Sequence, residues 1–246
     1  MPSYGCQHHG VVLAAGSGRR FGGPKAPVVV EGERLVDRAV RVLRQGGCSR
    51  VLVVLGAWVG PVAGAEVIVN TEWQTGMGSS LRCGLRHLSS ESQLELGKIH
   101  PRRAVITLVD LPGLTPAAIH HICDAPGDLL AATYCGIQGH PVLIGDYHWN
   151  ALIEELDGDS GARYYLMRHG VNLISLDQFA KGDDLDYPLK CKSLSSPAGW
   201  CIFRRLAHRV ESTLLRKVIL TESVRFSSRD GRGQSSFAKR WQYIDS

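Results

Sequence analysis

Residues 13–25 read LAAGSGRRFGGPK and set the interpretation of the whole chain. An apolar run, GVVLAA over residues 10–15, leads into this segment, as a buried parallel strand leads into the loop that follows it. The four glycines of the segment permit a tightly curved backbone whose N–H groups can surround an anion. Arg19, Arg20 and Lys25 add positive charge to it. We therefore expect a strand followed by a loop that binds phosphate groups.

The spacing of these glycines excludes two common phosphate-binding loops. The dinucleotide-binding fingerprint requires G-x-G-x-x-G, but Phe21 stands where the third glycine belongs after Gly16 and Gly18. The P-loop requires a glycine directly before its lysine and Ser or Thr after it, but Pro24 precedes Lys25 and an alanine follows. The segment is typical of neither class.

Strand-like and helix-like segments alternate after this loop. Short apolar runs predict strands over residues 50–55, 66–69, 103–109, 128–134, 141–144 and 171–176, with a turn at residues 136–139. Apolar residues at helical spacing predict helices over residues 35–43, 79–88, 116–123, 147–156 and 160–169, the third of them capped by Thr115. This alternation predicts an α/β fold, a single Rossmann-like domain over residues 8–189 in which helices cover both faces of a mostly parallel sheet.

A carboxylate directly follows one of the predicted strands. Asp110 comes after the strand RAVITLV, residues 103–109, and is followed by Leu111 and Pro112. Open α/β sheets bind ligands at the carboxyl ends of their strands. Mg²⁺ prefers one or two carboxylates together with phosphate oxygens and water. We therefore expect Asp110 to hold Mg²⁺, although an aspartate here can also serve as a turn or capping residue.

The loop resembles that of a known family. Its pattern L-A-A-G-x-[SG]-x-R-x-G-x-x-K is similar to that of the MobA-like NTP transferases, and among them to the molybdenum cofactor cytidylyltransferases. Later segments follow in the family's order. Residues 70–81, NTEWQTGMGSSL, resemble N-x-x-W-x-x-G-M-G-x-S-L, and Asp110 lies in a similar D-x-P motif. The resemblance extends over residues 8–189 and implies a nucleotidyltransferase fold.

The resemblance also implies roles for individual residues. Family members bind a nucleoside triphosphate in this loop and transfer its nucleoside monophosphate to a phosphorylated acceptor, releasing pyrophosphate. On this sequence the implied nucleotide-binding residues are Leu13, Ala14, Ala15, Gly16, Ser17, Gly18, Lys25, Gly78, Ser79 and Ser80. The implied catalytic residues are Arg19, Lys25 and Asp110, and the implied Mg²⁺ ligands are Asp110 and Asp186. Asp186 lies in DLDYP, residues 184–188, which is similar to the family's D-x-D-x-P, with Asp184 as the alternative ligand.

Two further segments resemble the acceptor side of the family's site. His140 lies in a G-H-P motif and Arg163 in GDSGAR, which is similar to the family's G-D-x-G-A-R. The resemblance implies that both residues bind the acceptor. A histidine in a turn can instead be structural, and Arg163 can be a surface cation.

Together these motifs imply transfer of CMP from CTP to a molybdopterin-type molybdenum cofactor. The sequence LAAG, residues 13–16, favours CTP because the family's guanylyltransferases carry L-A-G-G. The alternatives are GTP or another NTP as donor, a sugar or polyol phosphate as acceptor, and a non-catalytic module that hands the cofactor on. An acceptor molybdoenzyme or its chaperone is the implied protein partner.

The charges are distributed unevenly along the chain. It carries 28 Lys and Arg against 23 Asp and Glu, a net charge of +5. Residues 1–189 hold 16 basic and 19 acidic residues, whereas residues 190–246 hold 12 and 4. The basic surplus therefore belongs to a tail, residues 190–246, which we expect to be partly helical or disordered. This argues against a nucleic-acid partner for the domain, although a tail that binds nucleic acid or an acidic surface is an alternative.

The cysteines and the hydropathy bear on location. Seven cysteines, an odd number without C-x-x-C spacing, argue against a disulfide framework or a structural zinc site and favour a reducing cytoplasm. No apolar run reaches the ~20 residues of a membrane-spanning helix. Residues 1–10 lack the apolar core of a signal peptide. We expect a cytoplasmic protein with no membrane partner.

Overall fold

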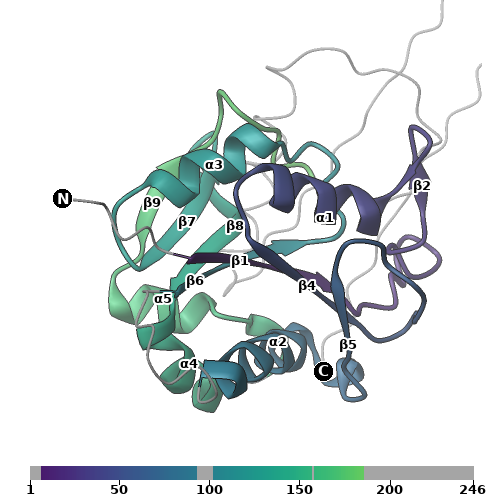
Figure 1. The fold of residues 1–246 in the computed structure, drawn as a ribbon, viewed down its shortest axis with the longest axis horizontal. Coiled ribbons are helices and arrows are strands. Elements are labelled where there is room, and N and C mark those ends of the chain that lie inside the picture. The colour runs from purple at the N-terminus through teal and green to yellow at the C-terminus, as the bar shows by residue number, and fades with distance from the viewer. Residues whose placement is uncertain (1–6, 93–101, 157, 186–246) are drawn as a thin grey trace, which may run out of the picture. The chain divides into compact units, whose positions relative to one another are not determined.

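A seven-stranded sheet forms the centre of the computed structural model, which describes residues 7–92, 102–156 and 158–185 (Figure 1). In spatial order its strands are β5 (Glu66–Val69), β4 (Arg50–Leu55), β1 (Gln7–Ala14), β6 (Arg102–Leu108), β8 (Ile137–Gly145), β7 (Leu129–Tyr134) and β9 (Asn172–Ser175). Within this sheet β8 pairs antiparallel with β6 and β7, and the other neighbouring strands are parallel. The prediction of an α/β fold with a mostly parallel sheet is confirmed.

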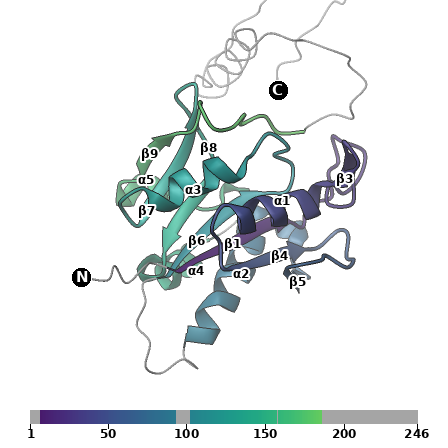
Figure 2. The same cartoon turned by 45° about the horizontal axis from the view of Figure 1, so that its top comes forward.

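Helices cover both faces of this sheet. α1 (Leu35–Gln45) and α3 (Pro116–Asp124) pack on one face, and α2 (Met77–Ser92), α4 (Trp149–Glu155) and α5 (Arg163–His169) pack on the other (Figures 1 and 2). Side chains alternate between the faces, so Val12 belongs to the core under α1 and α3, and Val11 to the core under α2, α4 and α5. Burial on both faces explains why strands such as β4 read as continuous apolar runs.

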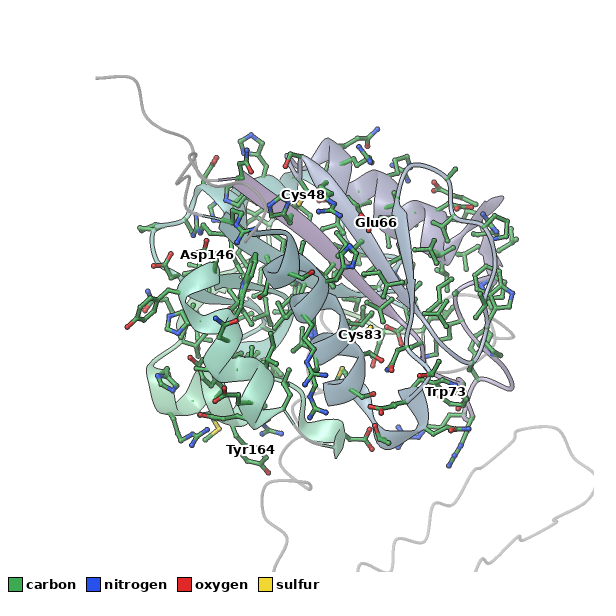
Figure 3. The ribbon with its side chains drawn as sticks, turned by 60° about the horizontal axis from the view of Figure 1, so that its bottom comes forward. Cys48, Glu66, Trp73, Cys83, Asp146 and Tyr164 are labelled. Carbon is green, nitrogen blue, oxygen red and sulfur yellow. The ribbon has the colours of Figure 1, made fainter. Side chains whose placement is uncertain are left out.

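The carboxyl ends of the parallel strands β4, β1 and β6 lie at one edge of the sheet. The loop after β1 starts at Ala15 and the loop after β6 starts at Val109. Figure 3 shows Trp73, which follows β5, and Cys48, which precedes β4, at opposite ends of the sheet. The segments that carry the sequence motifs therefore follow strands that end at one edge, which is where open α/β sheets bind ligands.

A return segment, residues 176–185, runs along the loop that follows β6. The backbone N–H of Lys181 donates to Gly113 O at 3.2 Å. The N–H of Leu185 donates to Asp110 O at 2.9 Å. A segment far away in the sequence thus holds the backbone of the loop that carries Asp110.

The predicted cap of α3 is confirmed, since Thr115 Oγ1 accepts the N–H of Ala118 at 3.2 Å. Two other local features differ from the prediction. A hairpin of β2 (Val29–Val30) and β3 (Glu33–Arg34) was not predicted, because strands this short have no readable periodicity. The strands predicted on either side of residues 136–139 pair as a hairpin, but its turn is shorter than predicted. β8 already begins at Ile137, and the chain reverses at Cys135 and Gly136, which both have positive φ.

Short 3₁₀ helices interrupt the last predicted helices. η1 (Trp73–Thr75) precedes α2, η2 (Asp146–His148) precedes α4, and η3 (Gly158–Ser160) precedes α5. The segments expected as single helices at residues 147–156 and 160–169 are therefore each divided into a 3₁₀ turn and a shorter α-helix.

One cysteine differs from the prediction that all of them are reduced. Cys48, Cys83 and Cys123 are free. Cys135 is disulfide-bonded.

The predicted tail, residues 190–246, and Asp186 both lie outside the described residues. Among the helices that the structure describes, none is long and apolar enough to cross a membrane.

Candidate functional site

A cavity of about 430 Å³ lies at the carboxyl edge of the sheet, next to the loop that follows β1. This volume falls in the range of roughly 300–1,000 Å³ that is usual for small-molecule sites. Its wall brings together most of the site residues predicted from the sequence: Leu13, Ala14, Ala15, Gly16, Ser17, Gly18, Arg19, Lys25, Ser80 and Asp110. Gly78, Ser79, His140 and Arg163 are not part of this wall.

The loop after β1 leaves one run of backbone donors available to a ligand. Within the part of the chain that the structure describes, the N–H groups of residues 16–19 donate to no acceptor. The N–H groups of Phe21, Gly22 and Gly23 instead turn back to Gly18 O, at 2.9, 2.9 and 3.1 Å. Residues 16–19 can therefore surround an anion, whereas the N–H groups of Gly22 and Gly23 are used within the loop itself.

Gly18 is required for this closed turn. Its φ is +60°, and a Cβ at this position would lie 2.0 Å from Gly23 O. A side chain at position 18 would therefore push residues 21–23 away, and the loop could not keep its curvature.

Lys25 and Asp110 form an ion pair at the cavity. Lys25 Nζ lies 2.7 Å from Asp110 Oδ2, and the two side chains are 13% and 17% exposed. The residues stand 85 positions apart in the sequence, so the pair joins the loop after β1 to the loop after β6. Two charged groups can be this deeply buried next to each other because each compensates the charge of the other.

The second oxygen of the Asp110 carboxylate is available. Asp110 Oδ1 is buried and has no hydrogen-bond partner among the described residues. A buried carboxylate oxygen without a partner is unfavourable unless a ligand, water or ion satisfies it. A divalent cation fits this position because hard cations such as Mg²⁺ bind carboxylate oxygen.

The protein supplies few other ligands for such a cation. The described residues contain no group of three or more His, Cys, Asp or Glu side chains that could hold a metal. A cation at Asp110 would therefore depend on phosphate oxygens and water for the rest of its coordination, as Mg²⁺ does in nucleotide sites. Leu185, which precedes the predicted ligand Asp186, hydrogen-bonds to the backbone of Asp110.

The turn before α2 uses its polar groups to build itself. Asn70 is only 5% exposed, and its Nδ2 donates to Ser79 Oγ at 2.9 Å and to Ser80 Oγ at 3.0 Å. Its Oδ1 accepts the N–H of Glu72 at 2.9 Å. Ser79 and Gly78 are buried, and Ser80 alone of the predicted residues 78–80 reaches the cavity wall. This turn therefore contributes more to the shape of the cavity than to its hydrogen-bonding capacity.

The predicted acceptor residues lie apart from the cavity wall. His140 is half-buried in β8, and its carbonyl accepts the hydroxyl of Tyr134 at 2.8 Å. Burial lowers the pKa of His140 to about 4, while the negative charge of Asp110 acts in the opposite direction. His140 thus lies within electrostatic reach of Asp110. Arg163 is exposed at the first turn of α5.

Some wall residues were not predicted from the sequence. They are Trp73, Gln74, Gly76, Met77, Leu108, Val109 and Asp159. Trp73, Gly76 and Met77 belong to the N-x-x-W-x-x-G-M-G pattern, and Asp159 belongs to the GDSGAR segment. The motifs could have indicated these residues, but a motif alone does not show which of its side chains face the cavity.

Comparison with known proteins identifies the family. The profile of the MobA-like NTP transferase domain matches residues 10–173, which is more than half of the chain. The match includes the loop after β1, Lys25, Asp110 and the turn before α2. The chain belongs to the MobA-like NTP transferase family, and its class is that of the nucleotidyltransferases.

Named relatives and solved structures agree with this assignment of fold and family. The chain is 32% identical over 195 residues to the nicotine blue oxidoreductase of Paenarthrobacter nicotinovorans, covering 72% of this chain and 91% of that protein. Over a shorter stretch of 45 residues it is 49% identical to a probable molybdenum cofactor guanylyltransferase of Opitutus terrae, covering 18% of this chain and 22% of that protein. The crystal structure of Rv0371c from Mycobacterium tuberculosis matches with a TM-score of 0.58 and 26% identity, over 82% of this chain and 98% of that chain.

Proposed function

We propose that this protein transfers CMP from CTP to a molybdopterin-type molybdenum cofactor and releases pyrophosphate. One observation carries the proposal. The unbonded N–H groups of residues 16–19, the cations Arg19 and Lys25, and the carboxylate of Asp110 meet at one cavity. Phosphate groups need backbone and cationic donors, and a bound metal ion needs the carboxylate.

The loop after β1 would hold the triphosphate. Its N–H groups at residues 16–19 would donate to phosphate oxygens, and the exposed Arg19 would add charge to the same contact. Lys25, now paired with Asp110, would donate to a phosphate of the bound nucleotide. The N–H groups of residues 16–19 are in place before the substrate binds, so they would stabilise the charge that develops on the leaving pyrophosphate without reorganisation.

Asp110 would hold Mg²⁺ through its unpartnered Oδ1, with Asp186 as the proposed second ligand. When bound, the ion would neutralise charge on the triphosphate and orient it. The hydrogen bond from Leu185 to Asp110 O supports this role for the adjacent Asp186, because it brings the end of the domain to Asp110. Within the domain, the loop and the return segment together would fix the orientation of the carboxylate.

The reaction needs no nucleophile from the protein. An oxygen of the acceptor's phosphate monoester, which is already anionic, would attack the α-phosphorus of CTP. A new phosphoanhydride bond would form, the bond to the β-phosphate would break, and pyrophosphate would leave with its electron pair. The protein would contribute positioning and electrostatic stabilisation. His140, near Asp110, and Arg163 are the proposed contacts of the acceptor.

The choice of CTP rests on LAAG at residues 13–16. GTP is the alternative donor, and a sugar or polyol phosphate is the alternative acceptor. The names of the relatives point to different substrates, and one of them is a probable molybdenum cofactor guanylyltransferase. The site of action is proposed to be the cytoplasm, where nucleoside triphosphates are made. An acceptor molybdoenzyme or its chaperone is the proposed protein partner, with a non-catalytic handover module as the alternative to an enzyme.

The test is pyrophosphate release by the purified full chain with Mg²⁺, each of the four NTPs, and either molybdopterin cofactor or a sugar or polyol phosphate. We expect release with CTP and molybdopterin cofactor. Release only with GTP, or only with another acceptor, would replace that part of the proposal. No release with any pair would contradict the proposed enzyme and favour the handover module.

Oxidoreduction is a second candidate, favoured by the relative named nicotine blue oxidoreductase, which the chain matches over most of its length. The cavity could hold the pyrophosphate of a nicotinamide dinucleotide at residues 16–19. Phe21 in place of the third fingerprint glycine weighs against it. Oxidation of NADH or NADPH by the purified protein in the presence of a heteroaromatic dye would establish this activity, and its absence would remove the candidate.

A further inference from the structure

The cavity has a second carboxylate that the proposed chemistry does not use. Asp159 lies in η3 and forms part of the cavity wall. Its side chain is exposed, and its Oδ1 accepts the N–H of Met77, the first residue of α2, at 3.3 Å. Among the described residues no hydrogen bond to its Oδ2 is present. One carboxylate oxygen therefore remains for a ligand.

Asp159 is held at this position by a close backbone approach. Gly76 has a φ of +119°, and a Cβ there would lie 2.5 Å from Gly158 O and 2.6 Å from Asp159 Oδ1. Position 76 therefore accepts only glycine if η3 is to lie against the start of α2. The position of Asp159 is thus fixed by the contact between two segments that are 82 residues apart.

The surroundings of Asp159 suit a flat ring. Trp73, Met77 and Ala15 belong to the same cavity wall. Trp73 packs against the backbone beside Ala15, since a Cβ on Gly56 would lie 2.7 Å from Trp73 and 2.8 Å from Ala15. Figure 3 shows Trp73 beside the start of α2. Aromatic and thioether groups pack well on the faces of heterocycles, and a carboxylate at the edge accepts hydrogen bonds from ring N–H or amino groups.

Charge decides which part of a nucleotide this carboxylate meets. A triphosphate carries several negative charges and would be repelled by Asp159, whereas Arg19, Lys25 and the N–H groups of residues 16–19 attract it. A nucleotide with its phosphates at that loop would place its base elsewhere in the same cavity. We propose that Asp159 is a specificity-determining residue that accepts a hydrogen bond from the amino group of the bound nucleobase.

This inference rests on the proposed function, because it requires a nucleoside triphosphate in the cavity. It predicts selection for bases that present an amino group, such as cytosine and guanine, over bases that present a carbonyl at the same place. Asp159→Asn is the informative substitution. The asparagine keeps an oxygen for the N–H of Met77 and replaces the second oxygen with an amide donor, so the preference for the amino group should be lost or reversed.

The experiment measures dissociation constants by calorimetry for CTP against UTP and for GTP against XTP, which carries a carbonyl in place of the 2-amino group, each with Mg²⁺ and the full chain. The pair members differ at the group that Asp159 would contact. We expect the unsubstituted protein to bind the amino member of at least one pair about tenfold more tightly, as one hydrogen bond to a charged group gives. Asp159→Asn should abolish or reverse that ratio. Glu154→Gln, which removes the same charge from α4 away from the cavity wall, should leave it unchanged.

A pterin carries the same amino-pyrimidine edge as guanine, so a third titration compares pterin with lumazine, which lacks the 2-amino group. A change confined to this pair in Asp159→Asn would assign the contact to the acceptor and overturn the assignment to the nucleobase. NTP binding without any change in the ratios would overturn the inference and leave the proposed function standing. No binding of any NTP would overturn both.

Discussion

Two regions of the cavity wall treat their polar groups in opposite ways. In the loop after β1, the N–H groups of residues 16–19 and the Oδ1 of the facing Asp110 have no partner among the described residues. In the turn before α2, Asn70 hydrogen-bonds to Ser79, Ser80 and the N–H of Glu72, so the polar groups of the turn are used by the turn itself. The first region is built to bind, and the second is built to hold its shape.

The comparison predicts different consequences for substitutions in the two regions. In the binding region, substitutions should change ligand affinity and turnover with little effect on folding. In the turn, they should lower the free energy of unfolding first and affect ligands only indirectly.

Asp110→Ala should lower the rate of pyrophosphate release by about 10²–10³-fold, because it removes the proposed Mg²⁺ ligand from a site that works by electrostatic stabilisation. Steady-state assays with CTP, Mg²⁺ and cofactor measure this. Asp37→Ala is the control, since Asp37 lies on α1 away from the cavity wall, where it pairs with Arg34 of β3. Equal rates for the two variants would contradict the assignment of Asp110.

Asn70→Ala should lower the free energy of unfolding by about 2–3 kcal/mol, because it leaves the buried groups around it without partners. Urea denaturation measures the change. Ser17→Ala, in the loop after β1, should change it by less than about 0.5 kcal/mol. If the two substitutions destabilised the protein equally, the contrast between the regions would not hold.

Lys25→Met should make the nucleotide-free protein bind Mn²⁺ about tenfold more tightly, because Asp110 Oδ2 is no longer paired with a cation. The same substitution should weaken binding of CTP with Mg²⁺, since a phosphate donor is lost. Electron paramagnetic resonance of free Mn²⁺ and calorimetry with CTP give the two values. Arg20→Met removes the same charge from an exposed side chain off the cavity wall, and it should leave the Mn²⁺ affinity unchanged. Unaltered Mn²⁺ binding in Lys25→Met would show that the ion pair does not compete with metal.

Thr115→Val should have the smallest effect, a loss of about 1 kcal/mol in the free energy of unfolding. Its hydroxyl caps α3 and also donates to Phe179 O at 2.7 Å, so it connects the Asp110 loop to the return segment. Thermal unfolding measures the loss, and CTP affinity should stay within about twofold. A large loss of affinity would mean that the return segment orders the binding region itself.

The sequence was sufficient to predict the sheet and the loop. The apolar run at residues 50–55 coincides with β4. A short, continuous apolar run of this kind is typical of a parallel strand that is buried on both faces. The ion pair of Lys25 with Asp110 could not be predicted, since it depends on two strand ends that are neighbours only in the folded sheet.

Other parts of the site depend on which member of a motif faces inwards. Asn70 and Asp159 lie in recognisable motifs, but their roles follow from burial and from contacts across 9 to 82 residues. Ser79 has the residue type of a binding group and is used internally. The roles of His140, Arg163 and Asp186 stay predictions from the resemblance.

The most direct test of the account is residue-resolved amide hydrogen exchange, measured by NMR with and without CTP and Mg²⁺. The unbonded N–H groups of residues 16–19 should exchange rapidly in the free protein and become strongly protected when the nucleotide binds. The N–H of Glu72, already bonded to Asn70, should change little. Binding of CTP with no added protection at residues 16–19 would contradict the claim that this loop is the phosphate-binding element.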